Sequence, residues 1–301
     1  MTEKNGLGRK LWKHRRLLPG LVVGRIVSPF YALANRLGAS DIYVKIFRRT
    51  LARSFTRMFY LLRKNTFDQT YFMGKHVLKF PTDLWSYQEV IWDKRPDVII
   101  ETGVFLGGST LFYSKLQAMM GNGRVIAMDI TLDNMDPDLK DAANVTVLEG
   151  SSSDPDMVAQ VKALISPNET VMVILDSDHA EEHVLAEMQL FSELVTADQY
   201  MIVEDGLIDR VYPLFNRGGP SRAIKRFMKQ NQDFKVDHYR TRFLLTQNPG
   251  GYLLKTADIS AAQSTEADNY RPLRLWLPFT QSPDDMRWLK LMGQNKRDEP
   301  E

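Results

Sequence analysis

The segment DVIIETGVFLGGST (97–110) joins a short apolar run to a glycine-rich turn and the start of a helix. Similar apolar runs recur along the chain: DVIIET (97–102), RVIAMD (124–129), VTVLEG (145–150), VMVILD (171–176) and YMIVED (200–205). Short apolar runs bounded by turn residues are typical of strands that are buried on both faces of a parallel sheet. We therefore predict five parallel strands between residues 97 and 205.

Helical segments separate these runs. Ser109 precedes an apolar helical stretch that stops at Gly121, and Asp154 with Pro155 forms a start signal for a second helix. Residues 184–195 keep one apolar stripe at helical spacing. Alternating strands and helices predict a doubly wound α/β sheet. Three later segments are expected to close the sheet as strands, with at least one antiparallel pair: FKVDHY (234–239), RFLLTQ (242–247) and GYLLK (251–255).

The composition is that of a globular chain, with 44% apolar and 25% charged residues among 301. The absence of cysteine excludes a disulfide framework, a thiolate metal site and a cysteine nucleophile. The net charge of +2 is unevenly divided, because residues 1–70 hold 15 Lys and Arg against 3 Asp and Glu. We therefore expect a basic helical arm (1–70), a central domain (71–255), and a linker with a docked C-terminal tail (256–301).

The arm contains a predicted amphipathic basic helix over residues 41–64. We favour its packing on the body or on another subunit of a homo-oligomer, and contact with a membrane surface is the alternative. Pro19, Gly20 and Arg25 interrupt the apolar run near the N-terminus, and no stretch reaches about 18 apolar residues. We therefore expect a cytoplasmic protein without a signal peptide or a membrane span.

Ligands of open α/β sheets bind outside the carboxyl ends of the strands, so the residues that end each strand are the candidates for a site. Glu101 ends the first run, and Gly103, Gly107 and Gly108 follow it. This spacing is not the dinucleotide-binding G-x-G-x-x-G, and a carboxylate is a poor neighbour for a pyrophosphate. A cationic or zwitterionic cofactor without phosphate is the better fit.

Two further strand ends suit a nucleoside. Asp129 can accept hydrogen bonds from ribose hydroxyls, and the polar turn at residues 150–154 can meet the edge of a base. Each signal is weak by itself, since Asp154 is also expected to cap the helix that begins at Pro155. Together they predict a nucleoside-bearing cofactor that lies across the first three strands.

Acidic residues end the last two parallel strands. Asp176, Glu204 and Asp205 are expected to converge there, and three carboxylates repel one another unless a cation or protons intervene. Such an all-oxygen cluster suits Mg²⁺ or a similar hard cation, although acids at strand ends also cap helices. His179 lies close enough to Asp176 to act as a general base or to contact the substrate, with a structural role as the alternative. His183 is expected on the helix surface with neither role.

Six motifs, in this order, resemble the family named after cephalosporin hydroxylase over residues 70–255: FPTDLWSYQEVI, ETGVFLGGS, RVIAMDI, GSSSD, VILDSDH and IVEDG. The resemblance implies the class I S-adenosylmethionine-dependent methyltransferase fold, with a mostly parallel, Rossmann-like sheet of seven strands. The same order of motifs is more distantly similar to catechol O-methyltransferase. The expected cofactors are therefore S-adenosylmethionine and Mg²⁺ or a similar divalent cation.

The resemblance also implies roles for individual residues in cofactor binding. Glu101, Gly103 and Ser109 would surround the methionine part of the cofactor. Asp129 would bind the ribose, and Ser152 would meet the adenine.

The implied metal ligands are Asp176, Glu204 and Asp205. Asp176 is also expected to contact the cofactor and to take part in catalysis. His179 stands where the catechol enzyme has a lysine, three residues after the first ligand, and we take it as the candidate base.

The expected function is Mg²⁺-dependent O-methylation of a hydroxyl on a sugar, a glycolipid or another natural product. Trp85, Tyr87 and Trp92 are candidates to line the acceptor pocket, with core packing as the alternative. An oxygenase-associated component and a non-catalytic cofactor-binding scaffold are the rival functions. Nucleic acid is not expected as a partner, because the basic charge is confined to the arm.

Overall fold

The computed structural model describes residues 30, 33, 36–38, 40–207 and 218–256. The chain divides into two compact units, Met1–Leu51 with Arg271–Glu301, and Ala52–Tyr270. Of the first unit, the structure describes chiefly the beginning of helix α3 (Ser40–Leu61), which confirms the helix expected over residues 41–64. The sheet and the candidate site belong to the second unit. Most of the predicted arm and nearly all of the tail lie outside the described residues.

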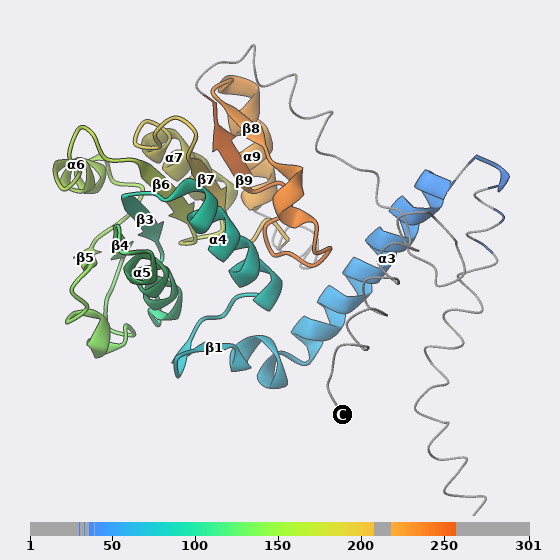
Figure 1. The fold of residues 1–301 in the computed structure, drawn as a ribbon, viewed down its shortest axis with the longest axis horizontal. Helices are drawn as coiled ribbons and strands as arrows, with labels where there is room; N and C mark the ends of the chain where they lie inside the picture. The colour runs from blue at the N-terminus through green and yellow to red at the C-terminus, as the bar shows by residue number, and fades with distance from the viewer. Residues whose placement is uncertain (1–29, 31–32, 34–35, 39, 208–217, 257–301) are drawn as a thin grey trace, which may run out of the picture. The chain divides into compact units, whose positions relative to one another are not determined.

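A seven-stranded sheet forms the centre of the second unit, in the order β5-β4-β3-β6-β7-β9-β8 (Figure 1). The five predicted parallel strands are β3 (Val98–Thr102), β4 (Arg124–Asp129), β5 (Val145–Glu149), β6 (Val171–Leu175) and β7 (Tyr200–Val203). They pair in parallel as expected. The remaining strands, β9 (Tyr252–Lys255) and β8 (Phe234–Val236), continue the sheet in antiparallel pairs. The strand order reverses between β3 and β6, which is where a doubly wound sheet binds its ligand.

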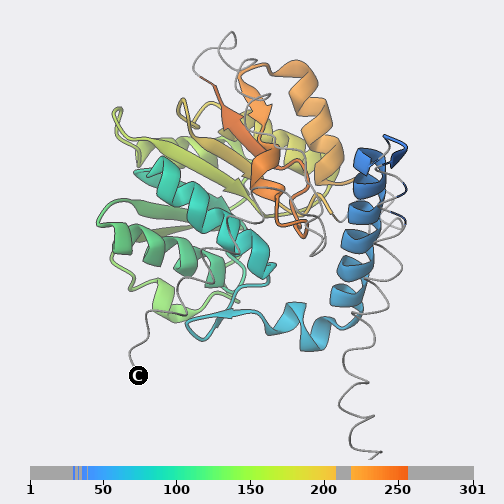
Figure 2. The ribbon, with the colours of Figure 1, turned by 45° about the vertical axis from the view of Figure 1, so that its right-hand side comes forward.

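Helices cover both faces of the sheet (Figure 2). One face packs against α4 (Pro81–Lys94) and α5 (Gly108–Met120), and the other against α6 (Pro155–Ala163), α7 (Glu181–Phe191) and α9 (Pro220–Gln230). Successive side chains of β3 alternate between these two cores, with Ile99 on the first and Ile100 on the second. The doubly wound fold predicted from the sequence is therefore confirmed.

The predicted helix starts have a local cause. Asp154 accepts a hydrogen bond from the backbone N–H of Asp156 at 3.0 Å, and Pro155 occupies the first turn of α6. This cap satisfies one of the backbone donors that a helix start leaves unpaired, and proline lacks the N–H that would be a second. Asp154 thus has the capping role that was one of its two expected roles.

The segment RFLLTQ (242–247) was expected to be a strand, and this was wrong. Residues 242–247 follow the short helix η4 (His238–Thr241) and pair with the start of α4 instead. Thr82 Oγ1 donates a hydrogen bond to the carbonyl oxygen of Leu245 at 2.7 Å, and the N–H of Gln247 donates to Asp83 at 2.8 Å. Because α4 satisfies these backbone groups, the segment needs no partner strand.

A connecting segment leads from α3 to the edge of the sheet. It consists of η1 (Arg63–Asn65), η2 (Phe67–Gln69) and the small antiparallel pair β1 (Tyr71–Phe72) and β2 (Lys75–His76), and η3 (Pro137–Leu139) lies in a later loop. Aromatic rings hold the segment together, since Phe59 contacts both Phe67 and Phe80. Phe80 directly precedes α4, so the segment ends beside the sheet.

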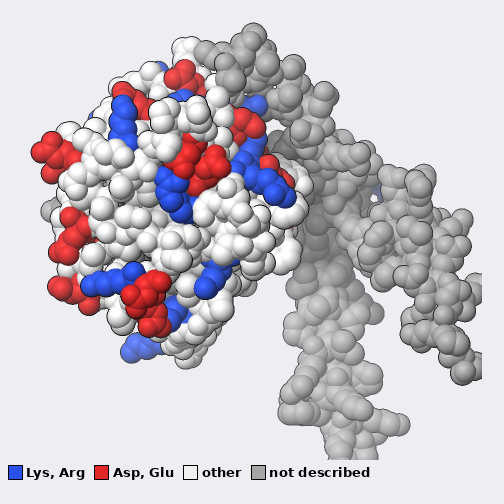
Figure 3. Space-filling view, turned by 60° about the vertical axis from the view of Figure 1, so that its left-hand side comes forward, with Lys and Arg blue, Asp and Glu red and all other residues white. Residues whose placement is uncertain are grey.

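One face of the described part of the chain is mixed in charge. On the face shown in Figure 3, acidic side chains lie among basic ones with wide uncharged areas between them. No helix among the described residues is both long enough and apolar enough to cross a membrane.

The ends of β3 and β6 approach each other closely at Gly103. Its φ is +85°, and a Cβ there would lie 2.0 Å from the backbone oxygen of Asp176, whereas Gly74 has a φ of +82° and open space around it. We expect Gly74→Ala to cost about 1 kcal/mol, the penalty for a side chain in left-handed backbone. Gly103→Ala should cost about 2 kcal/mol more, because two backbones must separate. Urea unfolding measures both, and equal losses would contradict this close approach.

Asp83, at the start of α4, gives the fold a pH dependence. Burial raises the pKa of Asp83 to about 6, although hydrogen bonds from Thr246 and Gln247 oppose that rise. The folded protein therefore keeps a proton that the unfolded chain loses between about pH 4 and pH 6, and stability falls as the pH rises through that window.

Asp83→Asn removes this titration. We expect the difference in unfolding free energy, wild type minus variant, to fall by up to about 3 kcal/mol between pH 4 and pH 6 and to stay constant at higher pH. Urea unfolding at a series of pH values checks this, and a difference that does not change with pH would contradict it.

Candidate functional site

A cavity of about 840 Å³ opens where the parallel strands end. The loops after β3, β4, β5 and β6 all contribute to its wall, and so does Asp205 after β7. Parallel neighbours end at the same edge of a sheet, which is why residues so far apart in the sequence meet here. The volume lies within the range of roughly 300–1,000 Å³ that is usual for small-molecule sites. This cavity is therefore the candidate site.

The cavity wall includes most of the residues predicted to bind the cofactor. The backbone N–H of Phe105 donates a hydrogen bond to Asp129 Oδ2 at 2.8 Å, which fixes the carboxylate at the end of β4. The N-terminus of α5 adds the Ser109 hydroxyl. The predicted cofactor residues that line the cavity are Gly103, Ser109, Asp129, Ser152 and Asp176. These five residues offer two carboxylates, hydroxyl groups and bare backbone, which fits a phosphate-free nucleoside with a cationic centre.

Glu101 lies behind this wall. It is fully buried, and it accepts hydrogen bonds from Ser109 Oγ and Thr110 Oγ1, each at 2.5 Å. Burial raises the pKa of Glu101 to about 7, against the lowering effects of Lys79 and the two hydroxyls. Glu101 is not among the residues that line the cavity. The structure therefore places it as the anchor of Ser109, which does reach the cavity.

His183 corrects an expectation, because it does not lie free on the surface of α7. It lines the cavity half-buried, with Nε2 at 3.0 Å from Ser177 Oγ and 3.3 Å from Ser152 Oγ. A hydrogen bond that the imidazole donates to Glu187 raises the pKa of His183 above its usual 6.5. Helical periodicity alone puts His183 on an outer face, but the loops after β5 and β6 cover that face.

Asp176, His179 and Asp205 form a polar cluster in the same wall. Each offers one ligand atom, and these atoms all lie within 4.8 Å of one another. His179 Nε2 is 3.2 Å from Asp205 Oδ2. Mg²⁺ is commonly held by one or two carboxylates while it keeps several water ligands, so Asp176 and Asp205 fit such an ion.

The backbone of Asp205 adopts a strained conformation that neighbouring hydrogen bonds stabilise. Its φ is +55°, a left-handed conformation that is costly for a residue other than glycine. The loop before β9 stabilises it, since Gln247 Nε2 donates to Asp205 Oδ1 at 3.1 Å and the Asp205 N–H donates to Asn248 Oδ1 at 3.0 Å. Burial raises the pKa of Asp205 to about 6, which His179 opposes and Asp176 reinforces.

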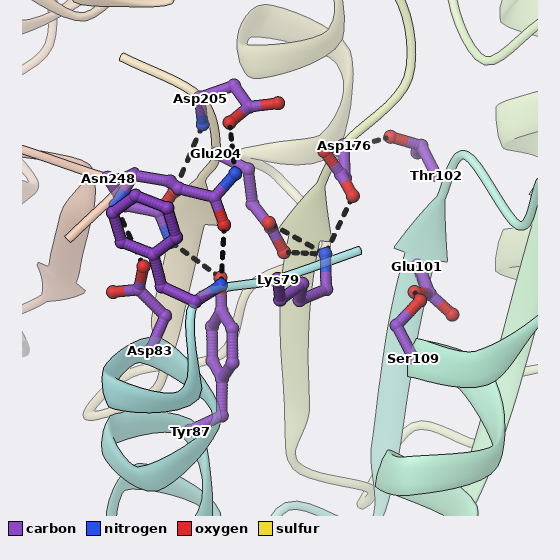
Figure 4. A network of polar contacts seen from close by, with 12 residues as sticks. Lys79, Asp83, Tyr87, Glu101, Thr102, Ser109, Asp176, Glu204, Asp205 and Asn248 are labelled. Carbon is purple, nitrogen blue, oxygen red and sulfur yellow. Dashed lines mark hydrogen bonds and ion pairs between the residues drawn. The ribbon is translucent and has the colours of Figure 1, made fainter. Parts of the chain in front are cut away.

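Lys79 is a charged residue of this site that the sequence analysis missed. Its side chain is 2% exposed, and its Nζ lies 2.7 Å from Asp176 Oδ2 and 2.7 Å from both carboxylate oxygens of Glu204 (Figure 4). Burial lowers the pKa of the Lys79 ammonium, but Asp176 and Glu204 outweigh burial and raise that pKa well above 10.5. The predicted metal ligand Glu204 thus faces a lysine, whereas Asp176 and Asp205 face the cavity.

Aromatic and basic side chains line the cavity as well. Tyr60, Arg63 and Phe67 come from the end of α3 and the segment after it, and Phe105 follows β3. No residue of α4 lines the cavity, which corrects the aromatic set expected there. Those expected residues lie elsewhere, because Tyr87 is fully buried in the core and both Trp85 and Trp92 are more than half exposed.

The comparisons with known proteins agree with this geometry. The family model Rhamnosyl O-methyltransferase/CmcI matches residues 64–256. A Rhamnosyl O-methyltransferase of Mycobacterium tuberculosis (strain ATCC 25618 / H37Rv) is 31% identical over 258 residues, which cover 81% of this chain and 98% of the relative. A protein of the same name from Mycobacterium leprae (strain TN) is 33% identical over 196 residues, 62% of this chain and 84% of the relative.

Two solved structures share the fold over 64% of this chain and 78% of theirs, each at 25% sequence identity. They are described as "cmcI-D160 Mg-SAM", with a TM-score of 0.51, and "CmcI-N160 apo-structure", with a TM-score of 0.52. The cofactors predicted from the sequence, S-adenosylmethionine and Mg²⁺, are those in the first description. By the match of its sequence and of its fold, the chain belongs to the Rhamnosyl O-methyltransferase/CmcI family and is a methyltransferase.

Proposed function

We propose that the protein transfers a methyl group from S-adenosylmethionine to a sugar hydroxyl with the help of Mg²⁺. The observation that carries this proposal is a single cavity whose wall holds the predicted cofactor residues, the Asp176, His179 and Asp205 cluster, and a set of aromatic side chains. The family match and the name of the mycobacterial relatives support O-methylation of a rhamnose-type sugar.

The residues of the chain have separate tasks in this reaction. S-adenosylmethionine supplies an electrophilic methyl group, and Mg²⁺ supplies a positive charge that favours an ionised hydroxyl. Asp176 and Asp205 would hold the cation. His179 would take the proton of the acceptor hydroxyl, with Asp205 at 3.2 Å to orient its ring. Gly103, Ser109, Asp129 and Ser152 would position the methyl donor, since alignment of the two reactants lowers the barrier further.

The aromatic part of the wall suits a sugar acceptor. Tyr60, Phe67 and Phe105 present flat apolar surfaces against which the C–H face of a pyranose can pack. Arg63 adds hydrogen-bond donors to the same wall. A sugar that is part of a glycolipid or another natural product is the acceptor class we propose.

The alternative functions account for less of the site. Non-haem iron oxygenases use two histidines and a carboxylate, whereas the cluster in this cavity has one histidine and two carboxylates. A non-catalytic scaffold gives no reason for the strained backbone of Asp205 or for its contact with His179.

We also propose that residues 71–255 form the catalytic domain, to which the arm (1–70) contributes Tyr60, Arg63 and Phe67. The linker and tail (256–301), a homo-oligomer and a cytoplasmic location stay predictions from the sequence.

The variants His179→Asn and Asp176→Asn distinguish the role of general base from the role of metal ligand. We expect His179→Asn to lower kcat by about 10²–10⁴-fold, the usual contribution of a general base, with little change in Mg²⁺ or cofactor affinity. Asp176→Asn should lose the heat of Mg²⁺ binding. Calorimetry measures both affinities, and conversion of S-adenosylmethionine to S-adenosylhomocysteine in the presence of a soluble rhamnoside measures turnover. A loss of the Mg²⁺ heat in His179→Asn would make this residue a ligand instead of the base.

We propose that α3 brings the enzyme to lipid-linked acceptors. Its described part exposes apolar side chains such as Leu51, Phe55 and Met58 together with Arg53 and Arg57, a combination that suits an anionic lipid surface. Such contact is the less favoured of the two interpretations of this helix in the sequence.

The test is Arg53→Glu/Arg57→Glu, assayed on a rhamnosyl lipid in anionic vesicles and on a soluble alkyl rhamnoside. At about 1 kcal/mol for each basic residue near the surface, we expect activity on the vesicles to fall at least tenfold and activity on the soluble acceptor less than twofold. Lys115→Glu/Lys162→Glu reverses two exposed charges on other helices and is the matched control. Equal losses on both acceptors would contradict membrane contact.

A further inference from the structure

A hydrogen-bonded cluster forms the part of the cavity wall that contains Ser152. It joins Ser152 after β5, Ser177 after β6, and the α7 residues His183 and Glu187. Ser152, Ser177 and His183 line the cavity, whereas Glu187 is fully buried behind them. The proposed function uses only Ser152 of these four residues. A buried carboxylate is costly unless it is paired, so the other three call for an explanation.

The hydrogen bonds of this cluster run in one direction. Ser177 Oγ lies 2.7 Å from Glu187 Oε1, and a carboxylate only accepts hydrogen bonds. The other oxygen, Glu187 Oε2, has no hydrogen-bond partner among the described residues, so the buried charge depends on the donor at Oε1. A hydroxyl group has a single hydrogen. Ser177 must therefore accept from its other neighbour, His183 Nε2 at 3.0 Å, and this nitrogen carries a hydrogen.

This direction decides which hydrogen bonds Ser152 can form. Its Oγ lies 3.3 Å from His183 Nε2, but a ring nitrogen that carries a hydrogen cannot accept one. Its distance to Ser177 Oγ is 3.5 Å, which is long for a hydrogen bond between two hydroxyl groups. A lone pair on a ligand in the cavity is the better acceptor. The cluster thus presents Ser152 to the cavity as a hydrogen-bond donor.

We infer that His183 and Glu187 are positioning residues that hold Ser152 as a donor and thereby select adenine as the base of the cofactor. This inference rests on the proposed function, since it places the base of S-adenosylmethionine at Ser152. Asp129, at the end of β4, would bind the ribose, and Ser152, beyond the end of the neighbouring β5, would meet the edge of the base remote from the sugar.

That edge distinguishes two purines. The N1 atom of adenine has a lone pair, whereas N1 of hypoxanthine carries a hydrogen. A donor at Ser152 bonds to the first and opposes the second. If the direction of the cluster could reverse, Ser152 could give its hydrogen to His183 and accept one from hypoxanthine. The preference between the two bases therefore reports the direction of the hydrogen bonds behind Ser152.

The test compares the binding of S-adenosylhomocysteine and S-inosylhomocysteine, which carries hypoxanthine, by calorimetry. We expect the wild type to prefer the adenine ligand at least about tenfold, since two opposed donors leave a buried polar group unsatisfied. Glu187→Gln keeps the shape of the side chain but can donate to Ser177, so it should lower this preference about fivefold or more. Glu182→Gln makes the same change at an exposed position of α7 and should leave the preference unchanged.

Two changes at His183 separate the donated hydrogen from packing. His183→Gln keeps an N–H donor near the position of Nε2, so its preference should stay within about threefold of the wild type. His183→Leu has no donor and should lose the preference as Glu187→Gln does. Because His183 is only half-buried, His183→Leu also provides the test if Glu187→Gln folds poorly.

Ser152→Ala removes the group that the cluster is proposed to orient. In that background, Glu187→Gln should change the preference less than about twofold, because residues that act through one another are not additive.

Three results would overturn the inference. An unchanged preference in both Glu187→Gln and His183→Leu would show that the direction of the cluster does not select the base. An equal loss of affinity for both ligands would show that His183 and Glu187 only support the wall. If the wild type binds neither ligand, the proposed cofactor site itself fails, and the inference fails with it.

Discussion

The convergence of negative charge at one edge of the sheet is the constraint on which the rest of the site depends. Parallel pairing of β3, β6 and β7 places the ends of these strands side by side, so Asp176 and Glu204 must lie close together and Asp205 follows directly. Buried carboxylates at such distances need compensation. The fold provides it with Lys79, whose ammonium lies 2.7 Å from both Asp176 and Glu204.

Hydrogen bonds from the neighbouring loop and from the start of α4 hold these charged residues in place. The loop that replaced the expected strand at residues 242–247 carries Gln247, which bonds to Asp205 and to the Phe80 backbone beside Lys79. Asp83 in turn holds Gln247 and Thr246. This loop thus links the start of α4 to the end of β7. Residues 242–247 therefore form hydrogen bonds across the site instead of pairing with another strand.

The strands and the acidic residues could be predicted because both depend on local pattern. Continuous apolar runs indicate buried parallel strands, and topology then brings their last residues together, which is how Asp176 and Asp205 were expected at one edge. Lys79 could not be predicted in this way, since it is 97 residues from Asp176 and 125 from Glu204 and belongs to no periodic segment. His183 and Glu101 were assigned to the right elements, but the loops that cover them are tertiary features. The same holds for the aromatic residues of the cavity wall, which come from the end of α3, the segment after it and the loop after β3, and not from α4.

The measurement that tests the account most directly is the location of the metal ion. Crystals of the protein with S-adenosylmethionine and Mn²⁺, examined by anomalous scattering, would give one ion position against named side chains. The account predicts one ion at the ends of β6 and β7, bound by Asp176 and Asp205 at the cavity wall. An ion that contacts neither Asp176 nor Asp205, or no ion at this edge of the sheet, would contradict it.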